Sequence, residues 1–447
     1  MLGRANAPAL EWQGQTYTFG EIEAASNQIA GWLAAQGFVA GDRLCVQLPN
    51  SLFVVQLFLA CLKLGVIYIP INVLYRDREV GHILQDAAPR LFLHAGEALP
   101  SASGYPSSRP NLGVLAGSTV AALIYTSGTT GPAKGAMLTH DNFAFNAMAL
   151  RSIWNLNSED RLLLALPLFH VHGLGNGILT WLVAGYRLRL LERFEAKLTE
   201  QEFLSFRPTV FFGVPTMYVR MLDWAAVPPA RLFVSGSAPL AEHTHAAFRE
   251  KFGAPILERY GMTEALMIAS NPLHGERRAG TVGLALPGVK VEVRPPEQEV
   301  FVQGPNVCAG YWGRPGPFLE DGWFRTGDIG ALSEDGYLTL NGRKSDLIIS
   351  SGFNIYPREI EEYLLEQPEI QEAAVIGVPD AAKGEVPVAC LVAASGAKID
   401  AETILGRCRE SLASFKVPRR VIWLDRLPRN ALGKIQKHLL AGEIGPQ

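Results

Sequence analysis

The sequence predicts an α/β protein with mostly parallel sheets covered by helices. Over most of residues 1–342, apolar runs typical of strands alternate with amphipathic stretches of helical period. Such alternation favours parallel sheets, because parallel strands need a crossover connection that is usually a helix. Two changes of composition, near Val289 and after Gly342, indicate a small β subdomain and a separate C-terminal domain.

The expected elements of residues 1–342 follow from the apolar pattern. Strands are expected at 43–48, 66–69, 90–93, 120–125, 161–166 and 231–235, and two of the helices at 19–36 and 52–64. Residues 289–337 have short apolar runs with many Gly and Pro residues, which is typical of a small β subdomain. Residues 97–118 are rich in Ser, Pro and Gly, and we expect them to cross the surface.

The C-terminal part has the pattern of a small α+β domain with its own core. We expect a hairpin around Ser351-Gly352 and a helix from Pro357. Strands at 373–376 and 386–392, a helix at 401–413 and a strand at 421–423 follow. The predicted domains are therefore 1–342 and 343–447.

Composition places the chain among ordinary globular proteins. A chain of 447 residues with 48% hydrophobic and 19% charged residues is expected to form two or three domains. A net charge of −3 provides no basic field for nucleic acid. We therefore expect no nucleic-acid partner.

The cysteines and the apolar segments indicate the compartment. Five cysteines lie without paired or metal-type spacing, so we expect buried thiols in a reducing environment. Residues 1–12 lack the apolar core of a signal peptide, and polar residues interrupt the apolar segment 51–75. We expect a soluble, cytoplasmic protein without membrane insertion. The pattern leaves open whether it is a monomer or a dimer.

A loop rich in glycine and hydroxyl residues follows the strand expected at 120–125. Glycines let backbone N–H groups approach an anion, hydroxyls donate to its oxygens, and a lysine supplies the counter-charge. The spacing of the glycines differs from that of a Walker loop, which excludes the common type of NTPase. A plain surface turn is the alternative. The candidate phosphate-binding residues are Thr126, Ser127, Gly128, Thr129, Thr130, Gly131 and Lys134.

Two further segments carry residues suited to a nucleotide. In 258–264, the ring of Tyr260 can stack on a base and Glu264 can hold Mg²⁺ against phosphate oxygens. In 323–328, Asp328 follows a Thr-Gly turn and can accept both ribose hydroxyls. Each segment has an alternative as an ordinary turn.

Two basic residues lie near the ends of the C-terminal domain. Arg343 stands at the predicted domain boundary, where it can reach a ribose or a phosphate. Lys434 follows a glycine on a loop expected to be mobile, so it can swing towards a bound nucleotide. In isolation, either residue is equally an exposed surface charge.

Taken in order, these segments resemble the adenylate-forming superfamily of acyl-CoA synthetases, luciferases and peptide-synthetase adenylation domains. The resemblance covers nearly the whole chain, from Thr16 to Lys437. Its motifs stand at 126–135, 260–264, 326–328, 342–346 and 433–434.

The resemblance implies a two-step ligase that uses ATP, Mg²⁺ and coenzyme A. In the first step, a carboxylate attacks the α-phosphorus of ATP and pyrophosphate leaves. The implied catalytic residues are Lys434, Glu264, Thr263 and His170, with Glu264 and Thr129 or Thr130 at the metal. The implied nucleotide-binding residues also include Gly236, Ser237, Ala238, Glu258, Arg259, Tyr260, Gly261, Met262, Asp328 and Arg343.

In the implied second step, the small domain rotates and exchanges its contacts with the active site. Lys434 leaves, and the hairpin with Ser351, Gly352 and Phe353 lines a tunnel for the CoA thiol. The family commonly has Lys or Asp at its hinge position, where this chain has Ser345. This departure leaves the moving side chain at the hinge open.

The implied acid-binding segments are more polar than a long acyl chain requires. Their candidate substrate residues are Val171, His172, Thr216, Met267, Ser270, Arg277 and Arg278. Either arginine can bind a second carboxylate through two parallel hydrogen bonds. Several of these stretches resemble malonyl-CoA synthetases, so malonate or a methyl-substituted malonate is expected.

Other functions stay open. If Arg277 and Arg278 are surface charges, the acid is a medium-chain fatty or an aromatic one. The acceptor can also be a carrier-protein thiol instead of CoA. A non-catalytic nucleotide sensor is disfavoured because Lys434, Glu264 and Asp328 occur together.

Overall fold

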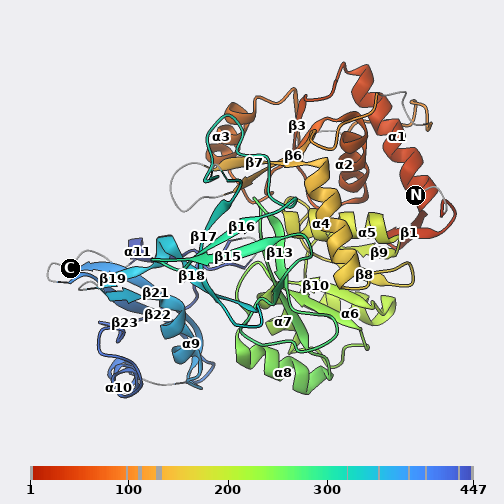
Figure 1. The fold of residues 1–447 in the computed structure, drawn as a ribbon. Helices are drawn as coiled ribbons and strands as arrows, with labels where there is room; N and C mark the ends of the chain where they lie inside the picture. The colour runs from red at the N-terminus through yellow and green to blue at the C-terminus, as the bar shows by residue number, and fades with distance from the viewer. Residues whose placement is uncertain are drawn as a thin grey trace.

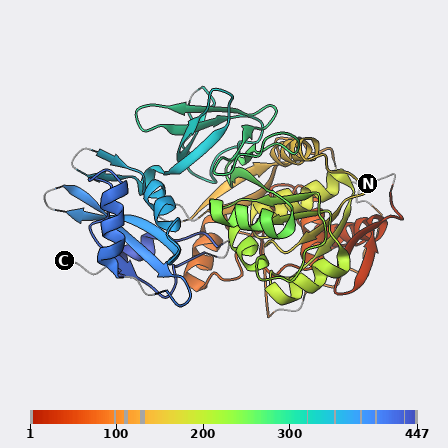
Figure 2. The same ribbon diagram turned by 90° about the horizontal axis from the view of Figure 1, so that it is seen from below.

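The computed structural model describes residues 4–96, 99–108, 113–126, 133–319, 321–350, 353–380, 383–397, 400–430 and 433–443. Figures 1 and 2 show a large N-terminal part and a smaller C-terminal lobe at one side of it. The α/β class expected from the sequence is confirmed, with four separate sheets.

The first sheet is mostly parallel and has the order β5-β3-β4-β6-β7. Its strands are β3 (Arg43–Gln47), β4 (Ile67–Pro70), β5 (Leu91–His94), β6 (Val120–Thr126) and β7 (Lys134–Thr139). Helices α2 (Leu52–Leu64) and α3 (Asp77–Ala87) make the crossovers, and β7 returns antiparallel to β6. The expected strands at 43–48, 66–69, 90–93 and 120–125 are confirmed to within one or two residues at each end.

The second sheet has nine strands in the order β14-β13-β12-β11-β10-β8-β9-β1-β2. Its bounds are β1 (Pro8–Trp12), β2 (Gln15–Thr18), β8 (Arg161–Leu164), β9 (Arg187–Leu190), β10 (Val210–Gly213), β11 (Leu232–Ser235), β12 (Ile256–Met262), β13 (Leu266–Ser270) and β14 (Leu284–Ala285). Helices α6 (Ala196–Phe206), α7 (Pro215–Met221) and α8 (Glu242–Phe252) connect its central strands. Their aromatic side chains pack on the sheet, with Phe203 stacked 6.2 Å from Phe233 and Tyr218 edge-on to Phe211.

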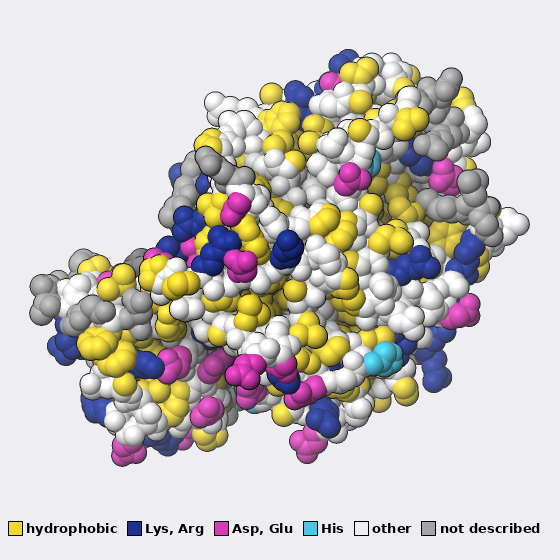
Figure 3. All heavy atoms as spheres, viewed as in Figure 1, with side chains coloured by type: hydrophobic (Ala, Val, Ile, Leu, Met, Phe, Trp, Pro, Cys, Tyr) yellow, Lys and Arg dark blue, Asp and Glu magenta, His cyan; other side chains and the backbone are white. Residues whose placement is uncertain are grey.

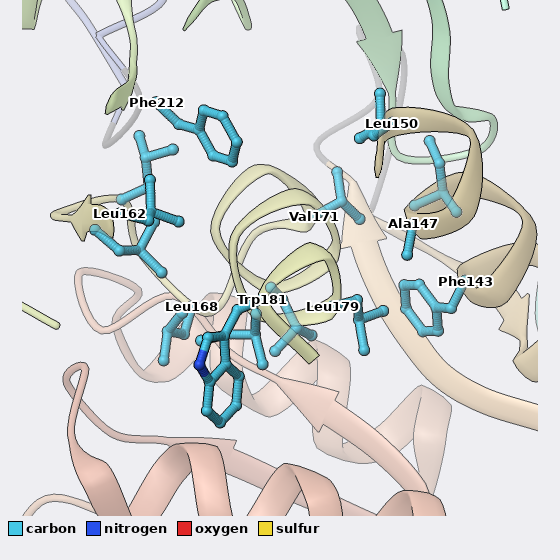
Figure 4. Close-up of a cluster of buried hydrophobic side chains, with 14 of the residues drawn as sticks. Phe143, Ala147, Leu150, Leu162, Leu168, Val171, Leu179, Trp181 and Phe212 are labelled. Carbon is cyan, nitrogen blue, oxygen red and sulfur yellow. The ribbon is translucent and has the colours of Figure 1, made fainter. Parts of the chain in front are cut away.

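One large hydrophobic core joins these two sheets. It includes side chains from α1 (Phe19–Ala35), α2, α4 (His140–Ile153), α5 (Leu179–Ala184) and the π-helical turn His172–Ile178. Figure 4 shows part of this core, where Val171 lies among side chains of α4 and α5. Thr18 and Ser51 cap the first turns of α1 and α2, which explains why these helices begin where the sequence predicts.

A third, antiparallel sheet leads to the C-terminal lobe. It contains β15 (Lys290–Arg294), β16 (Glu299–Gln303), β17 (Phe324–Leu332) and β18 (Leu338–Arg343), in that order. This is the β subdomain expected at 289–337, extended by β18. Its register pairs Asp328 of β17 with Arg343 of β18, so two residues fifteen positions apart in sequence face each other.

The C-terminal lobe follows a short 3₁₀ turn at Lys344–Asp346. Its elements are β19 (Ile348–Ser350), β20 (Phe353–Ile355), α9 (Pro357–Leu365), β21 (Ile370–Asp380), β22 (Gly384–Ala393), α10 (Ala401–Ser411), β23 (Val421–Trp423) and α11 (Lys437–Glu443). Two hydrophobic clusters consist only of residues in this lobe. The domain boundary between 342 and 343 stays a prediction.

Three smaller expectations can also be compared with the structure. Residues 254–257 read as a turn in the sequence, but β12 begins at Ile256 and residues 263–265 turn directly into β13. All five cysteines are free and buried, as expected. Among the described helices, we find none with the length and apolar character needed to span a membrane.

Asp160 provides a test of what holds the second sheet together. Its carboxylate is 4% exposed and accepts hydrogen bonds from Arg231, Thr209 and the Asn157 backbone. Burial alone raises the pKa of Asp160, but these hydrogen bonds outweigh burial and lower it below its ordinary value. Its charge therefore stabilises the fold at neutral pH, and this contribution is lost as the pH falls through the lowered pKa.

We expect Asp160→Asn to lower the free energy of unfolding by roughly 1–3 kcal/mol at pH 7, since Arg231 is partly screened by water. The difference from the unmutated protein should shrink below about pH 4, where Asp160 of the unfolded chain becomes protonated, and disappear as the pH falls through the lowered pKa of the folded state. Urea unfolding at several pH values measures both effects. Glu402→Gln is the control, because its ion pair with Arg409 is exposed. An equal loss in both variants would contradict the assignment.

Candidate active site

The candidate site lies where the ends of strands from different sheets meet. Strands β6 and β11 end at Thr126 and Ser235, and β12 ends at Met262, just before Glu264. In open α/β sheets, the carboxyl ends of strands are the usual place for a ligand. The Thr126 hydroxyl lies 3.4 Å from the Glu264 carboxylate, so the two large sheets meet at this point.

Glu264 is held by a tyrosine from a distant part of the chain. The side chain is 7% exposed, and its Oε1 accepts a hydrogen bond of 2.8 Å from the Tyr311 hydroxyl. The Lys134 ammonium lies over the same tyrosine ring, 5.5 Å from its centre. Burial and the charge of Glu264 raise the pKa of Tyr311, so its hydroxyl remains a donor. The expected metal residue Glu264 and the expected phosphate residue Lys134 therefore share one neighbour.

Asp328 lies at the centre of a second group of buried polar side chains. Its Oδ1 is 2.9 Å from Arg343 Nε, and its Oδ2 accepts a hydrogen bond from the Tyr260 hydroxyl. The backbone N–H of Asp328 donates to Thr326, whose hydroxyl in turn donates to the Val300 carbonyl. Asp328 and Tyr260 are each 6% exposed. The structure thus brings together three residues expected around a nucleotide, from β12, β17 and β18.

The C-terminal lobe directs Lys434 towards this group. Loss of surrounding water and the charge of Arg343 lower the pKa of Lys434, while Asp328 and Asp346 oppose that shift. The side chain nevertheless keeps contact with solvent. These influences show that Lys434 shares an electrostatic environment with Asp328 and Arg343.

Gly433, directly before Lys434, packs against the large domain. Its φ of +75° favours glycine, and a Cβ there would lie 2.7 Å from Thr216 Oγ1. Thr216 is near the start of α7. The expected substrate residue Thr216 therefore packs against the loop that carries Lys434 in this structure.

Arg259 lies in a buried group that we call the Arg259 cluster: Arg259, His170, His172, Ser237 and Tyr218. Burial and the positive charge of Arg259 lower the pKa of both histidines, to about 4 for His170. Both imidazoles are therefore neutral at pH 7. His172 Nδ1 lies 3.1 Å from the Ser237 hydroxyl, and the His172 backbone N–H donates to His170.

The guanidinium of Arg259 is unusual because it is a buried charge with two nitrogens that lack a hydrogen-bond partner among the described residues. The residue is 5% exposed, and among the described residues its Nε and Nη2 have no hydrogen-bond partner. The group lies directly against the Gly236 backbone, where a Cβ would overlap it. Burial lowers the pKa of Arg259 to about 9, so the group stays charged at neutral pH. A buried, charged donor without a partner is a site for an anion.

Glu258 connects this region to the C-terminal lobe. Burial raises its pKa to about 7, while the Gly280 N–H, 3.2 Å from Oε1, and the charge of Arg358 act in the opposite direction. Arg358 belongs to α9, and its guanidinium donates to the Leu340 carbonyl of β18. The C-terminal lobe thus contacts the large domain at α9 as well as at Gly433.

The two arginines expected to bind a second carboxylate are engaged elsewhere. Arg277 donates to the backbone carbonyls of Pro272, Pro255 and Leu273. Arg278 pairs with Asp335 and Glu276 and lies 3.9 Å from the centre of the Tyr337 ring. Both guanidiniums thus have partners within the protein, and a contact of either with the substrate stays a prediction.

Other expected substrate residues also have partners or a place within the protein. The Ser270 hydroxyl donates to the Asn271 carbonyl and accepts from the Trp154 indole. Met267 and Val171 are 1% and 7% exposed and belong to the large hydrophobic core. Packing, rather than polarity, is the observed role of Met267 and Val171.

Some expected residues lie outside the described part of the chain. These are Ser127, Gly128, Thr129, Thr130, Gly131, Ser351 and Gly352. Phe353, at the start of β20, is 53% exposed and stacks 4.6 Å from Phe415. A role of this hairpin in binding CoA stays a prediction, as do the nucleotide-binding roles of Gly236, Ala238, Gly261, Met262 and Thr263.

The residues present fit a magnesium ion held mainly by a nucleotide. Among the described residues, no group of three or more His, Cys, Asp or Glu side chains has the arrangement of a metal site. Magnesium in nucleotide sites commonly uses one or two carboxylates and completes its shell with phosphate and water oxygens. Glu264 provides one such carboxylate beside the segment expected to bind phosphate.

Tyr311 is the site residue that the sequence did not indicate. It lies 47 positions from Glu264, between β16 and β17, in a segment without a catalytic pattern. Its position comes from backbone pairing: Trp312 N–H donates to the Gly135 carbonyl, and Met137 N–H donates to the Gly310 carbonyl. No local signal in the sequence predicts such a pairing.

The face of the molecule seen in Figure 3 carries both signs of charge. Figure 3 shows basic and acidic side chains interspersed on the viewed face. This agrees with the small net charge of the chain.

Comparison with known families gives matches over both domains. A family model described as "AMP-binding enzyme" matches residues 2–312. A second, described as "AMP-binding enzyme C-terminal domain", matches residues 359–434.

Several curated proteins are similar over most of the chain. A feruloyl-CoA synthase from Amycolatopsis sp is 35% identical over 467 residues, which cover 97% of this chain and 95% of the relative. An oxalate–CoA ligase from Arabidopsis thaliana is 34% identical, with coverages of 94% and 91%. A malonate–CoA ligase from Arabidopsis thaliana is 36% identical over 371 residues, with coverages of 73% and 61%.

Solved structures match both the fold and the domain arrangement. ATP-bound MatB from Rhodopseudomonas palustris has a TM-score of 0.94 at 37% identity, covering 98% of this chain and 96% of that chain. The apo form of MatB has the same identity and coverages but a TM-score of 0.82. MenE from Bacillus subtilis with ATP and magnesium has a TM-score of 0.86 at 31% identity, with coverages of 96% and 95%. The present arrangement is thus more similar to ATP-bound MatB than to apo MatB.

Gly433→Ala tests whether the contact with Thr216 positions Lys434. The added methyl group should displace the loop, and a misplacement of this size is expected to reduce the acid-dependent release of pyrophosphate about tenfold or more. Gly396→Ala is a matched control, because Gly396 has a φ of +78° but no atom within 4 Å of its Cβ position.

The second substitution Thr216→Ala removes the clashing Oγ1 and Cγ2 atoms. It should restore part of the lost rate to Gly433→Ala. Equal losses in Gly433→Ala and Gly396→Ala, measured at equal thermal stability, would show that backbone strain alone is responsible.

Proposed function

Because the chain belongs to the family of AMP-binding enzymes, we propose that it is an ATP-dependent acid–CoA ligase for malonate or a methyl-substituted malonate. The observation that carries the choice of acid is the buried, unpartnered guanidinium of Arg259. The ligase class is supported by relatives named as CoA ligases or synthases, although their named acids differ widely.

In the proposed first step, the side chains bind and orient two anions that repel each other. Asp328 accepts the ribose hydroxyls, and the ion pair with Arg343 orients the Asp328 carboxylate. Lys434 neutralises charge where the acid carboxylate oxygen attacks the α-phosphorus, while the bond to pyrophosphate breaks. Glu264 would hold a magnesium ion, which would supply further charge neutralisation at the phosphates. Electrostatic stabilisation and positioning are therefore the main contributions of the protein.

In the proposed second step, the CoA thiol sulfur attacks the acyl carbonyl of the adenylate. The thiol proton is released and AMP leaves. For this reaction Lys434 leaves the site. Its loop packs against Thr216 in the present arrangement and must separate from that residue. The difference in TM-score between ATP-bound and apo MatB supports a change of domain arrangement in a related protein.

Two cations, Lys434 and Arg259, support a dicarboxylic acid. The N-terminal turn of α7 carries Thr216, against which the Lys434 loop packs, and Tyr218. Arg259 and Tyr218 each oppose the effect of burial on the pKa of the other. A small acid with one carboxylate near Lys434 can place its second carboxylate at Arg259. The pairing would satisfy a guanidinium that is otherwise buried without a partner.

Arg259 takes over the role that we first expected of Arg277 or Arg278. Those two guanidiniums have three carbonyl and two carboxylate partners, respectively. Recruiting either of them would require breaking existing interactions. Arg259 requires no such exchange.

Aromatic and fatty acids are the competing substrates. A feruloyl-CoA synthase is among the relatives of this chain. A large apolar acid would leave the charge of Arg259 unpaired in an apolar environment, which costs several kcal/mol. The alternative acceptor, a carrier-protein thiol, is tested by comparing free CoA with a phosphopantetheine carrier.

A panel of acids tests the proposed function directly. Acid-dependent pyrophosphate release with CoA present should be highest for malonate or methylmalonate. Acetate, octanoate, benzoate and ferulate should give much lower kcat/KM. Release with every acid at the level without acid would exclude the ligase activity, and a preference for ferulate or octanoate would exclude only the proposed acid.

Arg259→Met tests the residue proposed to select the acid. Loss of the guanidinium should reduce kcat/KM for malonate more than kcat/KM for butyrate, which lacks the second carboxylate. The difference between the two losses should correspond to roughly 2–5 kcal/mol of transition-state free energy. Arg278→Met is the control, since its guanidinium pairs with Asp335 and Glu276. If the ratio of malonate to butyrate is the same in Arg259→Met and the unmutated enzyme, the pairing does not exist.

A further inference from the structure

Tyr311 holds one particular oxygen of the Glu264 carboxylate. Its hydroxyl donates to Oε1 at 2.8 Å, and the Thr126 hydroxyl reaches the same oxygen at 3.4 Å. No hydrogen bond or ion pair to Oε2 is present among the described residues. The carboxylate therefore has one occupied and one available oxygen.

The position of Tyr311 is set by its surroundings rather than by Glu264. The ring is 9% exposed, and residue 311 forms a β-bridge with Ala136 of β7. The neighbouring Trp312 N–H donates to Gly135 in the same strand. The Tyr311 hydroxyl is thus a fixed donor, and Glu264 must orient towards it.

A fixed donor on one oxygen limits how the carboxylate can bind a cation. Magnesium requires near-octahedral geometry with short bonds, whereas calcium accepts carboxylates through one or both oxygens. Because the hydroxyls of both Tyr311 and Thr126 are directed to Oε1, a cation meets less competition at Oε2. Such a group suits magnesium and disfavours the two-oxygen binding open to calcium.

We propose that Tyr311 is a positioning residue that reserves Oε1 of Glu264, restricts this carboxylate to single-oxygen metal binding, and so favours magnesium over calcium. The proposal rests on the use of ATP in the proposed function, but it does not depend on which acid is the substrate. Tyr311 acts through Glu264 and does not itself touch the metal.

Tyr311→Phe removes only the hydroxyl. The ring under Lys134 and the backbone pairing with β7 stay in place, so the fold should be retained. The measurement is calorimetric titration with ATP, in the absence of acid, with magnesium, calcium or no divalent cation. Tyr363→Phe is the control, because its hydroxyl bonds to Arg407 and Ser411 in the C-terminal lobe.

We expect the affinity of Tyr311→Phe for ATP with magnesium to fall about three- to tenfold, which corresponds to the net contribution of one ordinary hydrogen bond. Affinity without a divalent cation should be unchanged. The ratio of affinities with calcium and with magnesium should rise at least threefold. Tyr363→Phe should behave as the unmutated protein does.

An equal loss of ATP affinity with magnesium, with calcium and without either cation would overturn the proposal, since Tyr311 would then only support the pocket. Unchanged affinities in Tyr311→Phe would also overturn it. Failure of the malonate assignment would leave these ATP titrations unaffected. Failure of the unmutated protein to bind ATP would refute both this proposal and the ligase function.

Discussion

The interaction of Asp328 with Arg343 and Tyr260 joins the three parts of the molecule that any reaction here must use. Tyr260 belongs to the second large sheet, and Asp328 and Arg343 belong to the antiparallel sheet. Arg343 ends the strand that leads into the C-terminal lobe. Because all three side chains are largely enclosed, each needs the others to satisfy its hydrogen bonds or charge. The relative placement of the sheets therefore depends on the contacts of one carboxylate.

The same principle of enclosed charge explains the contrast between Arg343 and Arg259. Arg343 is paired, and the charge of Asp328 raises its pKa. Arg259 is deeply buried and unpaired, so burial lowers its pKa. A charge held in this way adds nothing to stability by itself, but it gains most from an incoming anion. One arginine thus organises the site, and the other supports the proposed selection of the acid.

The contacts of the C-terminal lobe are small and local. Gly433 meets Thr216, and Arg358 of α9 meets the Leu340 carbonyl. A few contacts of this kind can be exchanged without disturbing either hydrophobic core. Such a boundary is consistent with two arrangements of the lobes.

Much of the fold was predictable because its signals are local. The helix expected at 52–64 matches α2, and the one expected at 19–36 differs from α1 by one residue, since apolar spacing and capping side chains act within a few positions. The turn expected at 254–257 was wrong in its second half, because pairing with β11 begins strand β12 at Ile256. Tyr311 could not be predicted, since its contact with Glu264 depends on pairing between distant segments.

The sequence by itself determined the residue types, their order and the strands that carry them, and these were enough to indicate a nucleotide site with Lys434, Glu264 and Asp328. Only the tertiary structure decided which arginine side chains have partners within the protein. Arg259, Arg277 and Arg278 carry the same group, but Arg277 donates to the Pro255 and Leu273 carbonyls and Arg278 pairs with Asp335. Arg259 lies on a buried strand against Gly236, where no described acceptor reaches its Nε and Nη2. Availability depends on neighbours in space, and the linear spacing of charged residues does not contain that information.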